Sequence, residues 1–210
     1  MSADGPPLAV LWDADGVLQR VPDGAEESMR PAVADRIDDV EAFLAEALVA
    51  ERPALTGEAS WPEVLPGLLA RWGIADALDS VLATWLRVEP VAGAREVLAR
   101  VRAAGTPCYL ATNQAAERAA AMRRDLGYDG LVDGGFFSFE LGVAKPDPAY
   151  FRVIGEILGL PPGDLLFIDD VTANVAAARC VGLRAHTWSY RDGTPALLSL
   201  LRGHGLSLGY

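Results

Sequence analysis

The stretch Leu8–Val17, which reads L-A-V-L-W-D-A-D-G-V, joins an apolar run to two acids one residue apart and a glycine. A continuous apolar run is typical of a strand that is buried on both faces, as in a parallel sheet. Asp13 and Asp15 then follow the carboxyl end of that strand, which is where open α/β sheets bind their ligands. Because Asp-Gly is also a common turn dipeptide, this stretch alone leaves a simple polar turn open.

The acidic loop does not match a calcium-binding EF-hand. An EF-hand loop beginning at Asp13 needs glycine at its sixth position and glutamate at its twelfth. Those positions hold Leu18 and Gly24, and Gly16 comes too early in the loop. The sequence therefore excludes this kind of calcium site.

The length and composition indicate a globular chain of one domain with a large insertion, or of two small domains, without a basic surface. The 210 residues are 51% hydrophobic and 22% charged, with a formal net charge of -11. Such an acidic chain is a poor match for a nucleic-acid backbone, and an anionic small substrate requires a local cation. No apolar run approaches the roughly 20 residues of a membrane span. We therefore expect no nucleic-acid or membrane partner, and a monomer or a homodimer.

The cysteines and the amino terminus favour a cytoplasmic location. Cys108 and Cys180 lie in apolar segments without the spacing of a metal site, so we expect reduced core residues. The first residues, 1–5, lack the basic start and apolar core of a secretory signal peptide.

The segment 18–90 is predicted to be helical. A proline- and glycine-containing linker over 18–32 precedes three amphipathic patterns: a helix from Val33 to Leu48, a second helix after the capping box at Ser60–Glu63, and a third over 76–86. Pro66 conflicts with the second helix, and we expect a kink or a late start there. No strand signal occurs within 18–90, so this segment is predicted to be an all-helical insertion.

From Val91 onward, helices and strands alternate. This order predicts a doubly wound parallel sheet with right-handed crossovers, an α/β fold formed by the residues on either side of the insertion. The strands are expected at 107–112, 135–139, 165–168 and 184–188, and the helices at 93–104, 114–126, 147–159 and 173–181.

Polar residues that suit one chemistry follow three of these strands. Asp13 and Asp15 follow the first, Thr112-Asn113 the second, and Asp169-Asp170 a later one. Acids that converge at one sheet edge repel one another unless a cation lies among them, and oxygen ligands beside a phosphate favour Mg²⁺. Lys145, the only lysine among 18 basic residues, lies in a nearby Gly/Pro-bounded loop.

With these motifs in this order, the chain resembles the haloacid dehalogenase (HAD) superfamily, in its phosphatase-like branch with a helical cap inserted after the first motif. The resemblance implies a Rossmann-like catalytic core formed by 1–17 and 91–210 and a cap domain over 18–90. It also implies a Mg²⁺-dependent hydrolase acting on a small phosphorylated metabolite. It implies Asp13 as the nucleophile that forms an aspartyl-phosphate and Asp15 as the general acid/base. Thr112, Asn113 and Lys145 would hold the phosphoryl group.

The resemblance also implies a metal site. Asp13, Asp170 and the backbone carbonyl of Asp15 would hold Mg²⁺, with Asp169 in or beside this ligand set. Two positions depart from the family pattern, because Trp12 replaces a more frequent phenylalanine and Asn174 replaces a more frequent aspartate. Asn174 leaves the outer surroundings of the metal less defined.

Three other functions remain open on this scaffold: a haloacid dehalogenase, a phosphomutase and a non-catalytic binding domain. The dehalogenase fits less well because that branch lacks the second acid, Asp15. The sequence does not reveal the substrate. Arg20 and Arg52 are candidates for binding a second anionic group, and His186 and His204 are expected to be structural or surface residues.

Overall fold

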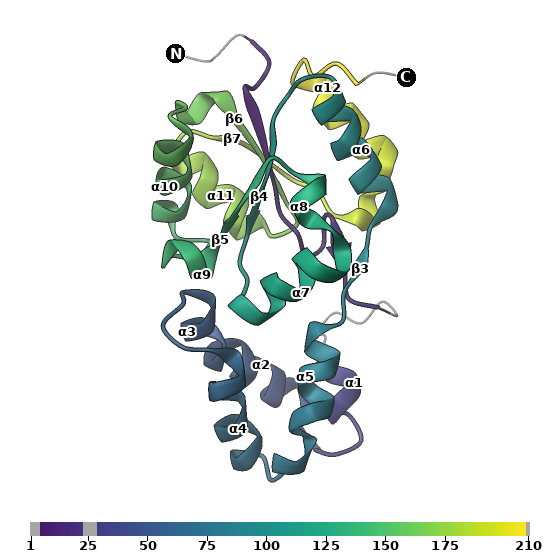
Figure 1. The fold of residues 1–210 in the computed structure, drawn as a ribbon, viewed down its shortest axis with the longest axis vertical. Helices are drawn as coiled ribbons and strands as arrows, with labels where there is room; N and C mark the ends of the chain where they lie inside the picture. The colour runs from purple at the N-terminus through teal and green to yellow at the C-terminus, as the bar shows by residue number, and fades with distance from the viewer. Residues whose placement is uncertain (1–4, 23–28, 209–210) are drawn as a thin grey trace.

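The computed structural model describes residues 5–22 and 29–208, and these form two lobes (Figure 1). The α/β lobe contains a five-stranded sheet, and the helical lobe comprises the helices between Arg30 and Leu86. Part of the expected linker over 18–32, and most of the amino-terminal stretch considered for a signal peptide, lie outside the described residues. Within the described residues, no helix is long and apolar enough to cross a bilayer.

The five strands form one parallel sheet in the order β5-β4-β1-β6-β7. This order confirms the doubly wound α/β fold. The strands are β1 (Ala9–Trp12), β4 (Cys108–Thr112), β5 (Gly134–Phe137), β6 (Leu165–Asp169) and β7 (Arg184–Thr187).

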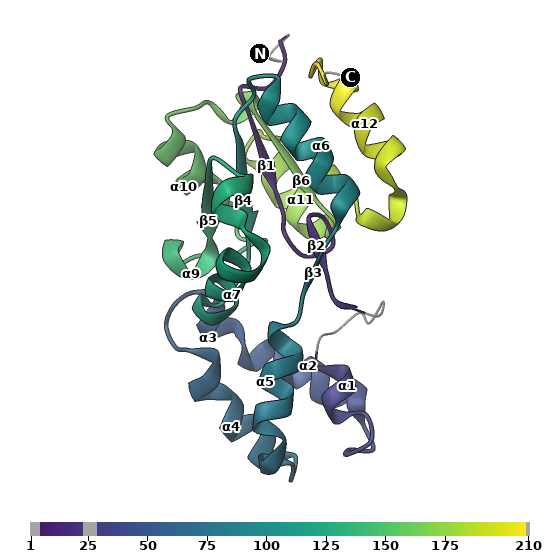
Figure 2. The same ribbon diagram turned by 45° about the vertical axis from the view of Figure 1, so that its right-hand side comes forward.

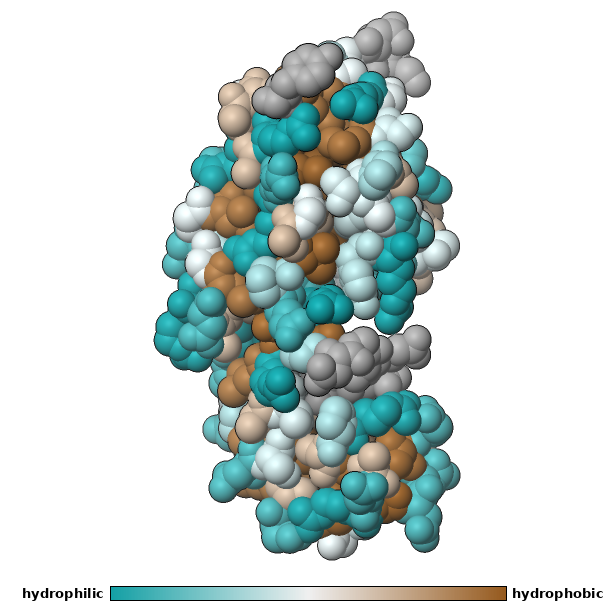
Figure 3. All heavy atoms as spheres, turned by 90° about the vertical axis from the view of Figure 1, so that its right-hand side faces the viewer, coloured by the Kyte–Doolittle hydropathy of each residue, from teal (hydrophilic) through white to brown (hydrophobic). Residues whose placement is uncertain are grey.

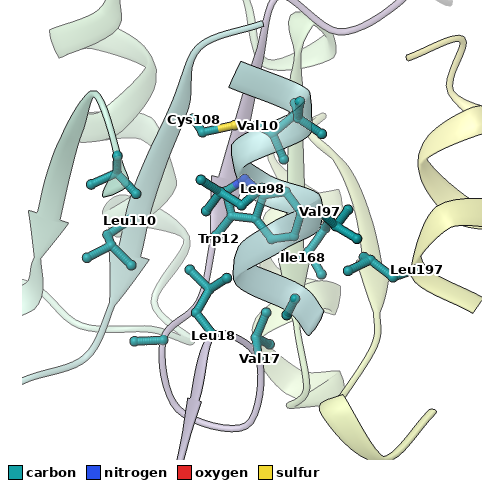
Figure 4. Close-up of a cluster of buried hydrophobic side chains, with 14 of the residues drawn as sticks. Val10, Trp12, Val17, Leu18, Val97, Leu98, Cys108, Leu110, Ile168 and Leu197 are labelled. Carbon is teal, nitrogen blue, oxygen red and sulfur yellow. The ribbon is translucent and has the colours of Figure 1, made fainter. Parts of the chain in front are cut away.

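Helices cover both faces of the sheet. Alternate residues of β1 point to opposite faces, as the period of a strand requires. Val10 and Trp12 pack beneath α6 (Ala92–Ala103) and α12 (Thr194–Gly203), as Figure 4 shows for Val97, Leu98 and Leu197. Ala9 and Leu11 pack against the opposite layer, α10 (Pro148–Leu158) and α11 (Thr172–Cys180). The continuous apolar run therefore reflects burial on two faces.

The helical lobe has a hydrophobic core of its own. Its elements are α1 (Arg30–Val33), α2 (Val40–Ala50), α3 (Arg52–Leu55), α4 (Trp61–Arg71), a 3-10 turn at Ala75–Ala77 and α5 (Leu78–Leu86). Phe43, Trp61 and Trp85 are buried in one cluster that is separate from the two clusters flanking the sheet. Figure 3 shows this lobe below the α/β lobe.

The helix predicted from Val33 to Leu48 is wrong in one respect, because the structure divides it into α1 and α2. The break falls before Asp39, whose side chain accepts a hydrogen bond from the backbone N–H of Ala42 at 2.9 Å. Aspartate is a preferred N-cap residue because its carboxylate satisfies a backbone donor at the start of a helix. Apolar spacing alone did not reveal this cap.

The second helix of this lobe starts where its capping box predicts. Ser60 and Glu63 form the reciprocal box at the start of α4. The alternative of a late start is wrong, because the helix begins at Trp61 and contains Pro66.

Two short strands join the lobes, and the sequence pattern did not predict them. The strand β2 (Gln19–Arg20) leads out of the α/β lobe and β3 (Glu89–Pro90) leads back, and the two pair antiparallel (Figure 2). The backbone N–H of Val91 also donates to the carbonyl of Leu18 at 3.0 Å. The outward and return paths of the chain are therefore adjacent.

The remaining differences between the predicted and observed elements lie in the α/β lobe. The strand expected over 135–139 ends at Phe137, and Ser138–Leu141 form the short helix α9. The terminal helix α12 was not predicted. The other helical elements are α7 (Ala116–Leu126), α8 (Tyr128–Leu131), and the 3-10 turns Pro162–Asp164 and Tyr190–Asp192.

Candidate active site

The three central strands bring the predicted residues to one edge of the sheet. The strand β1 lies between β4 and β6, so Asp13 lies between Thr112, the last residue of β4, and Asp169, the last residue of β6. Parallel strands all end at the same edge, which accounts for this convergence. Asp13, Thr112 and Asp169 are all buried.

Lys145 lies between two of these carboxylates. Its Nζ is 2.8 Å from Asp13 Oδ1 and 2.6 Å from Asp169 Oδ2, and its side chain is 1% exposed. Burial acts to lower the pKa of Lys145, but the two carboxylates outweigh it and hold this pKa above its usual value. The lysine is therefore a fixed ammonium at the base of the site.

Asn113 fixes the loop that carries this lysine. Its side-chain Nδ2 donates to the backbone carbonyl of Lys145 at 2.8 Å, and its Oδ1 accepts from the backbone N–H of Lys145 at 2.9 Å. This two-way bridge joins segments 32 residues apart in sequence. The side chain of Asn113 thus positions Lys145.

Asp13 has one carboxylate oxygen occupied and one without a protein donor among the described residues. The backbone N–H of Ala14 donates to Oδ1 at 2.8 Å, and Lys145 Nζ contacts the same atom. Within the described part of the chain, no donor lies within hydrogen-bond distance of Oδ2. The carboxylate is held at one oxygen while the other is available for reaction.

A cluster of three carboxylates meets the requirements of a divalent cation. Asp13, Asp169 and Asp170 each offer an oxygen within 4.8 Å of the others. Burial raises the pKa of Asp13 well above its usual value, since Lys145 offsets only part of this cost and Asp169 adds a second negative charge. Burial, with Asp169, also raises the pKa of Asp170 to about 6. When the three carboxylates are ionised, the single ammonium of Lys145 leaves the cluster with a net negative charge. Their oxygen donors suit a hard cation such as Mg²⁺.

Gly16 allows Asp170 to lie close to the first acidic loop. Gly16 has φ +75°, and a Cβ atom at this position would collide with the carboxylate of Asp170. Only glycine adopts this conformation readily and leaves this space empty. The glycine of the opening motif therefore brings the acids of β1 and β6 together.

Asp169 is held from several directions. Its Oδ1 accepts the backbone N–H of Val171 at 2.7 Å, and Asn174 Nδ2 donates to both carboxylate oxygens at 3.1 and 3.0 Å. With Lys145 on Oδ2, the carboxylate is fully engaged. Asn174, which departs from the family pattern, thus serves to orient Asp169.

Three side chains that sequence reasoning missed hold Asp15. Gln19 Nε2 donates to Oδ1 at 2.9 Å, Gln114 Nε2 to Oδ2 at 2.6 Å, and Arg118 Nη2 to Oδ1 at 3.1 Å. All three residues are buried. Gln114 directly follows the Thr112-Asn113 motif, and this adjacency was the one available signal, whereas Gln19 and Arg118 became evident only from the fold.

A cavity of about 520 Å³ lies over these residues and is lined by both lobes. The α/β lobe contributes Asp13, Asp15, Lys145 and Asp170, and the helical lobe contributes Leu44, Leu48, Glu51 and Trp85, among others. Of the two arginines predicted to bind a second anion, Arg20 lines this cavity and Arg52 does not. Arg52 is exposed at the start of α3.

The model of the haloacid dehalogenase-like hydrolase family matches residues 7–182 of this sequence. The chain belongs to this family. Among curated relatives of this HAD-like hydrolase, phosphoglycolate phosphatase from Rhodospirillum rubrum is 30% identical over 213 residues, covering 92% of this chain and 84% of that protein. Phosphatase MT3486 from Mycobacterium tuberculosis is 41% identical over 75 residues, so the match spans only 34% of this chain and 35% of that protein.

A solved structure shows the same fold. HAD family enzyme bt-2542 from Bacteroides thetaiotaomicron superposes with a TM-score of 0.77 and 20% identity, covering 93% of this chain and 99% of that chain. The family and fold expected from the sequence motifs are therefore confirmed.

Two further predictions concern residues of the HAD-like hydrolase outside this site. Cys108 is buried as expected, but Cys180 is exposed at the end of α11, so its assignment to the core is wrong. His186 and His204 do not line the cavity, and they contact each other through Nε2 atoms 2.8 Å apart. This contact joins β7 to the residue that follows α12.

Proposed function

We propose that this HAD-like hydrolase is a Mg²⁺-dependent phosphatase that acts on a small phosphorylated metabolite through an aspartyl-phosphate on Asp13. The observation that carries this proposal is the state of the Asp13 carboxylate, which is held at Oδ1 by Lys145 and Ala14 while Oδ2 has no donor among the described residues. A carboxylate held in this way is suited to in-line attack on phosphorus.

In the first step, Oδ2 of Asp13 forms a bond to phosphorus as the bond to the ester oxygen breaks. Asp15, oriented by Gln114 and Arg118, donates its proton to the leaving oxygen, and the product alcohol departs. In the second step, Asp15 takes a proton from water, the water oxygen attacks phosphorus, and the bond to Asp13 breaks. Inorganic phosphate leaves, and the carboxylate is restored.

The remaining polar residues would stabilise the transferring group. Thr112, the backbone around Asn113, and Lys145 would contact the phosphoryl oxygens, where negative charge must be neutralised. Thr112 and Asn113 line the same cavity as Asp13, as does Lys145.

Asp13, Asp170 and the backbone carbonyl of Asp15 would hold Mg²⁺, with Asp169 beside them. When bound, the ion would neutralise the charge of the phosphate and of the acidic cluster. The side chain of Asp15 is engaged by Gln19, Gln114 and Arg118, which is consistent with a contribution from its backbone only. The bt-2542 enzyme has been solved in complex with magnesium and inorganic phosphate, which supports this assignment.

We also propose that residues 18–90 act as a cap domain over a catalytic core formed by 1–17 and 91–210. Two features support this division: the separate hydrophobic cluster of the helical lobe, and the lining of the cavity by residues of both lobes. The cap would exclude water during phosphoryl transfer and contact the part of the substrate that leaves.

The test is release of inorganic phosphate from p-nitrophenyl phosphate by the full chain. Asp13→Asn should abolish turnover, since an amide is a far weaker nucleophile of the same size, whereas the matched change Asp79→Asn at an exposed position of α5 should not. Halide release from 2-haloacids is measured in parallel. Full activity of Asp13→Asn, or halide release without phosphate release, would overturn the proposal.

A further inference from the structure

We propose that Arg20, Tyr190 and Arg191 form a second anion subsite, which binds a carboxylate or phosphate at the end of the substrate remote from the reacting phosphoryl group. This inference rests on the proposed phosphatase function. It defines the substrate class as a phosphate monoester whose alcohol has an apolar body and a terminal oxyanion.

The two arginines reach the same place from distant parts of the chain. Arg20 belongs to β2, Arg191 to the 3-10 turn Tyr190–Asp192, and both line the cavity that contains Asp13. The Arg20 and Arg191 Cζ atoms are 6.0 and 5.3 Å from the centroid of the Tyr190 ring. Two guanidinium groups therefore lie around one aromatic ring that also lines the cavity.

This arrangement is anchored to the catalytic loop. Tyr190 N–H donates to the carbonyl of Gly16 at 2.9 Å, and a reciprocal Ser189–Asp192 capping box closes the turn. The subsite is thus connected through one hydrogen bond to the loop that carries Asp13 and Asp15. Its position relative to the reacting group is set by backbone contacts.

The charges of the subsite are not fully balanced. Arg20 pairs with Glu89 at 3.0 Å, a carboxylate that does not line the cavity. Within the described part of the chain, Arg191 has no carboxylate within ion-pair distance. The acid nearest to Arg191 in sequence, Asp192, accepts a hydrogen bond from the backbone N–H of Ser189 at 2.8 Å, so Arg191 is left as a cation without an ion pair among the described residues, in a chain whose net charge is -11. Arg118, by contrast, is already paired with Asp15 at 3.1 Å.

Part of the wall of this cavity is apolar. Met29, Leu44 and Leu48 line the cavity from the helical lobe, and Val171 lines it from the α/β lobe. Leu48 and Val171 are 60% and 46% exposed, so a ligand would cover apolar surface that now faces solvent. A cavity of about 520 Å³ is far larger than a phosphoryl group with a two-carbon acid requires. An extended alcohol with a terminal anion fits both the walls and the charges.

The experiment uses ω-phosphonooxy carboxylates with one to five methylene groups. Each is compared with the alkyl phosphate of equal length that lacks the carboxylate, and kcat/KM is measured from phosphate release. The ratio of the two kcat/KM values isolates the contribution of the terminal anion at each chain length. A parallel series of α,ω-bisphosphates distinguishes a terminal phosphate from a terminal carboxylate.

We expect the ratio to rise beyond a single methylene and to reach its maximum at a longer chain. At that length, Arg191→Gln should lower the ratio about threefold, and the double variant with Arg20→Gln about tenfold, as partly exposed ion pairs allow. Arg52→Gln is the matched control, because it removes the same charge from an exposed arginine outside the cavity. This control should leave the ratio unchanged.

Two different failures can be distinguished. If phosphate is released but the ratio stays near one at every length, or if Arg52→Gln lowers it as much as Arg191→Gln, the subsite is overturned and the phosphatase function stands. If no ester releases phosphate, including p-nitrophenyl phosphate, the proposed function itself fails and the subsite fails with it. Because Arg191 is exposed, its substitution is a readable test even if Arg20→Gln disturbs the pairing of β2 with β3.

Discussion

The Nζ atom of Lys145 lies 2.8 Å from Oδ1 of Asp13, although the two residues are 132 positions apart in sequence, the difference between their residue numbers. The ammonium has no room to move, because Asp169 is 2.6 Å away on another side and the side chain is 1% exposed. A guanidinium is planar and wider than an ammonium, so it should displace Asp13 or the phosphate.

We therefore expect Lys145→Arg to lower kcat about a hundredfold, since a misplacement of about 1 Å can cost this much. The measurement is kcat on p-nitrophenyl phosphate, with circular dichroism to check folding. If Lys145→Arg keeps more than about half of the wild-type rate, which is a barrier change below ~0.5 kcal/mol, the lysine contributes charge only.

Arg118 is expected to act by positioning Asp15. It is buried in the first turn of α7 and donates to Asp15, while its guanidinium lies 5.9 Å from the ring of Trp85 in the helical lobe. Arg118→Met should lower kcat by about tenfold or more, because Asp15 then loses one of its three side-chain donors.

The matched control is Arg123→Met on the same helix, where the arginine pairs with Glu140. Comparison of kcat with KM separates positioning from substrate binding. A loss confined to KM would assign Arg118 to binding, and an equal loss in Arg123→Met would indicate a general effect on α7.

Gly16→Ala should damage the metal site, because the new Cβ would collide with the carboxylate of Asp170. The control is Gly73→Ala, since Gly73 also has a positive φ, +70°, but a Cβ atom there would meet none of the described residues within 4 Å. Both variants should lose about 1–2 kcal/mol of stability from the left-handed conformation.

Only Gly16→Ala should raise the Mg²⁺ concentration needed for half-maximal activity. The measurements are unfolding free energy and a Mg²⁺ titration of phosphate release. Equal metal requirements in the two variants would contradict the proposed proximity of the two acidic loops.

Removal of metal should abolish activity. Chelation should leave Asp13, Asp169 and Asp170 without a counter-cation, and Mg²⁺ should restore turnover. Ca²⁺ should inhibit, because its larger and more flexible coordination misplaces the phosphate. Normal turnover by chelated enzyme would exclude a metal-dependent mechanism.

The histidine pair should make folding stability depend on pH. Burial lowers the pKa of His186 and of His204, with further lowering of His186 by His204 and Arg179, and of His204 by Arg184. The unfolded chain then binds more protons than the folded protein below about pH 6.5, so stability is lost as the pH falls from about 7 to about 5.

The measurement is Tm as a function of pH for the wild type and for His204→Asn. The variant should show a smaller change in Tm across this range, because one of the two titrating groups is removed. Identical pH profiles would show that the pair does not contribute.

The α/β fold and the acids of the site could be predicted from the sequence, because both depend on local patterns. The run of Leu8–Trp12 reports burial on both faces, and polar residues after successive strands must meet at one edge of a parallel sheet. The residues around Asp15 were not predictable in this way. Gln19 and Arg118 lie 4 and 103 positions from Asp15, and only the fold shows that both face it.

Errors in the helical segment have a different physical cause. Apolar periodicity indicates which face of a helix is buried, but it does not indicate where a capping side chain ends one helix and begins another. Asp39 ends the apparent continuity of the first helix by capping α2. The pairing of β2 with β3 involves only two residues on each side, which is too short for a strand pattern to be visible.

Because the outward strand β2 and the return strand β3 are adjacent, the segment between them can change during evolution without altering the sheet of the α/β lobe. Leu18 and Val91 are joined by a backbone hydrogen bond of 3.0 Å, so the two ends of the intervening segment are already side by side. A segment inserted at such a point can be lengthened, shortened or exchanged while the sheet keeps its register, because its ends require no new closure. Given the proposed role of this segment as a cap, we expect substrate preference to diverge through this one junction while the proposed catalytic residues stay in place.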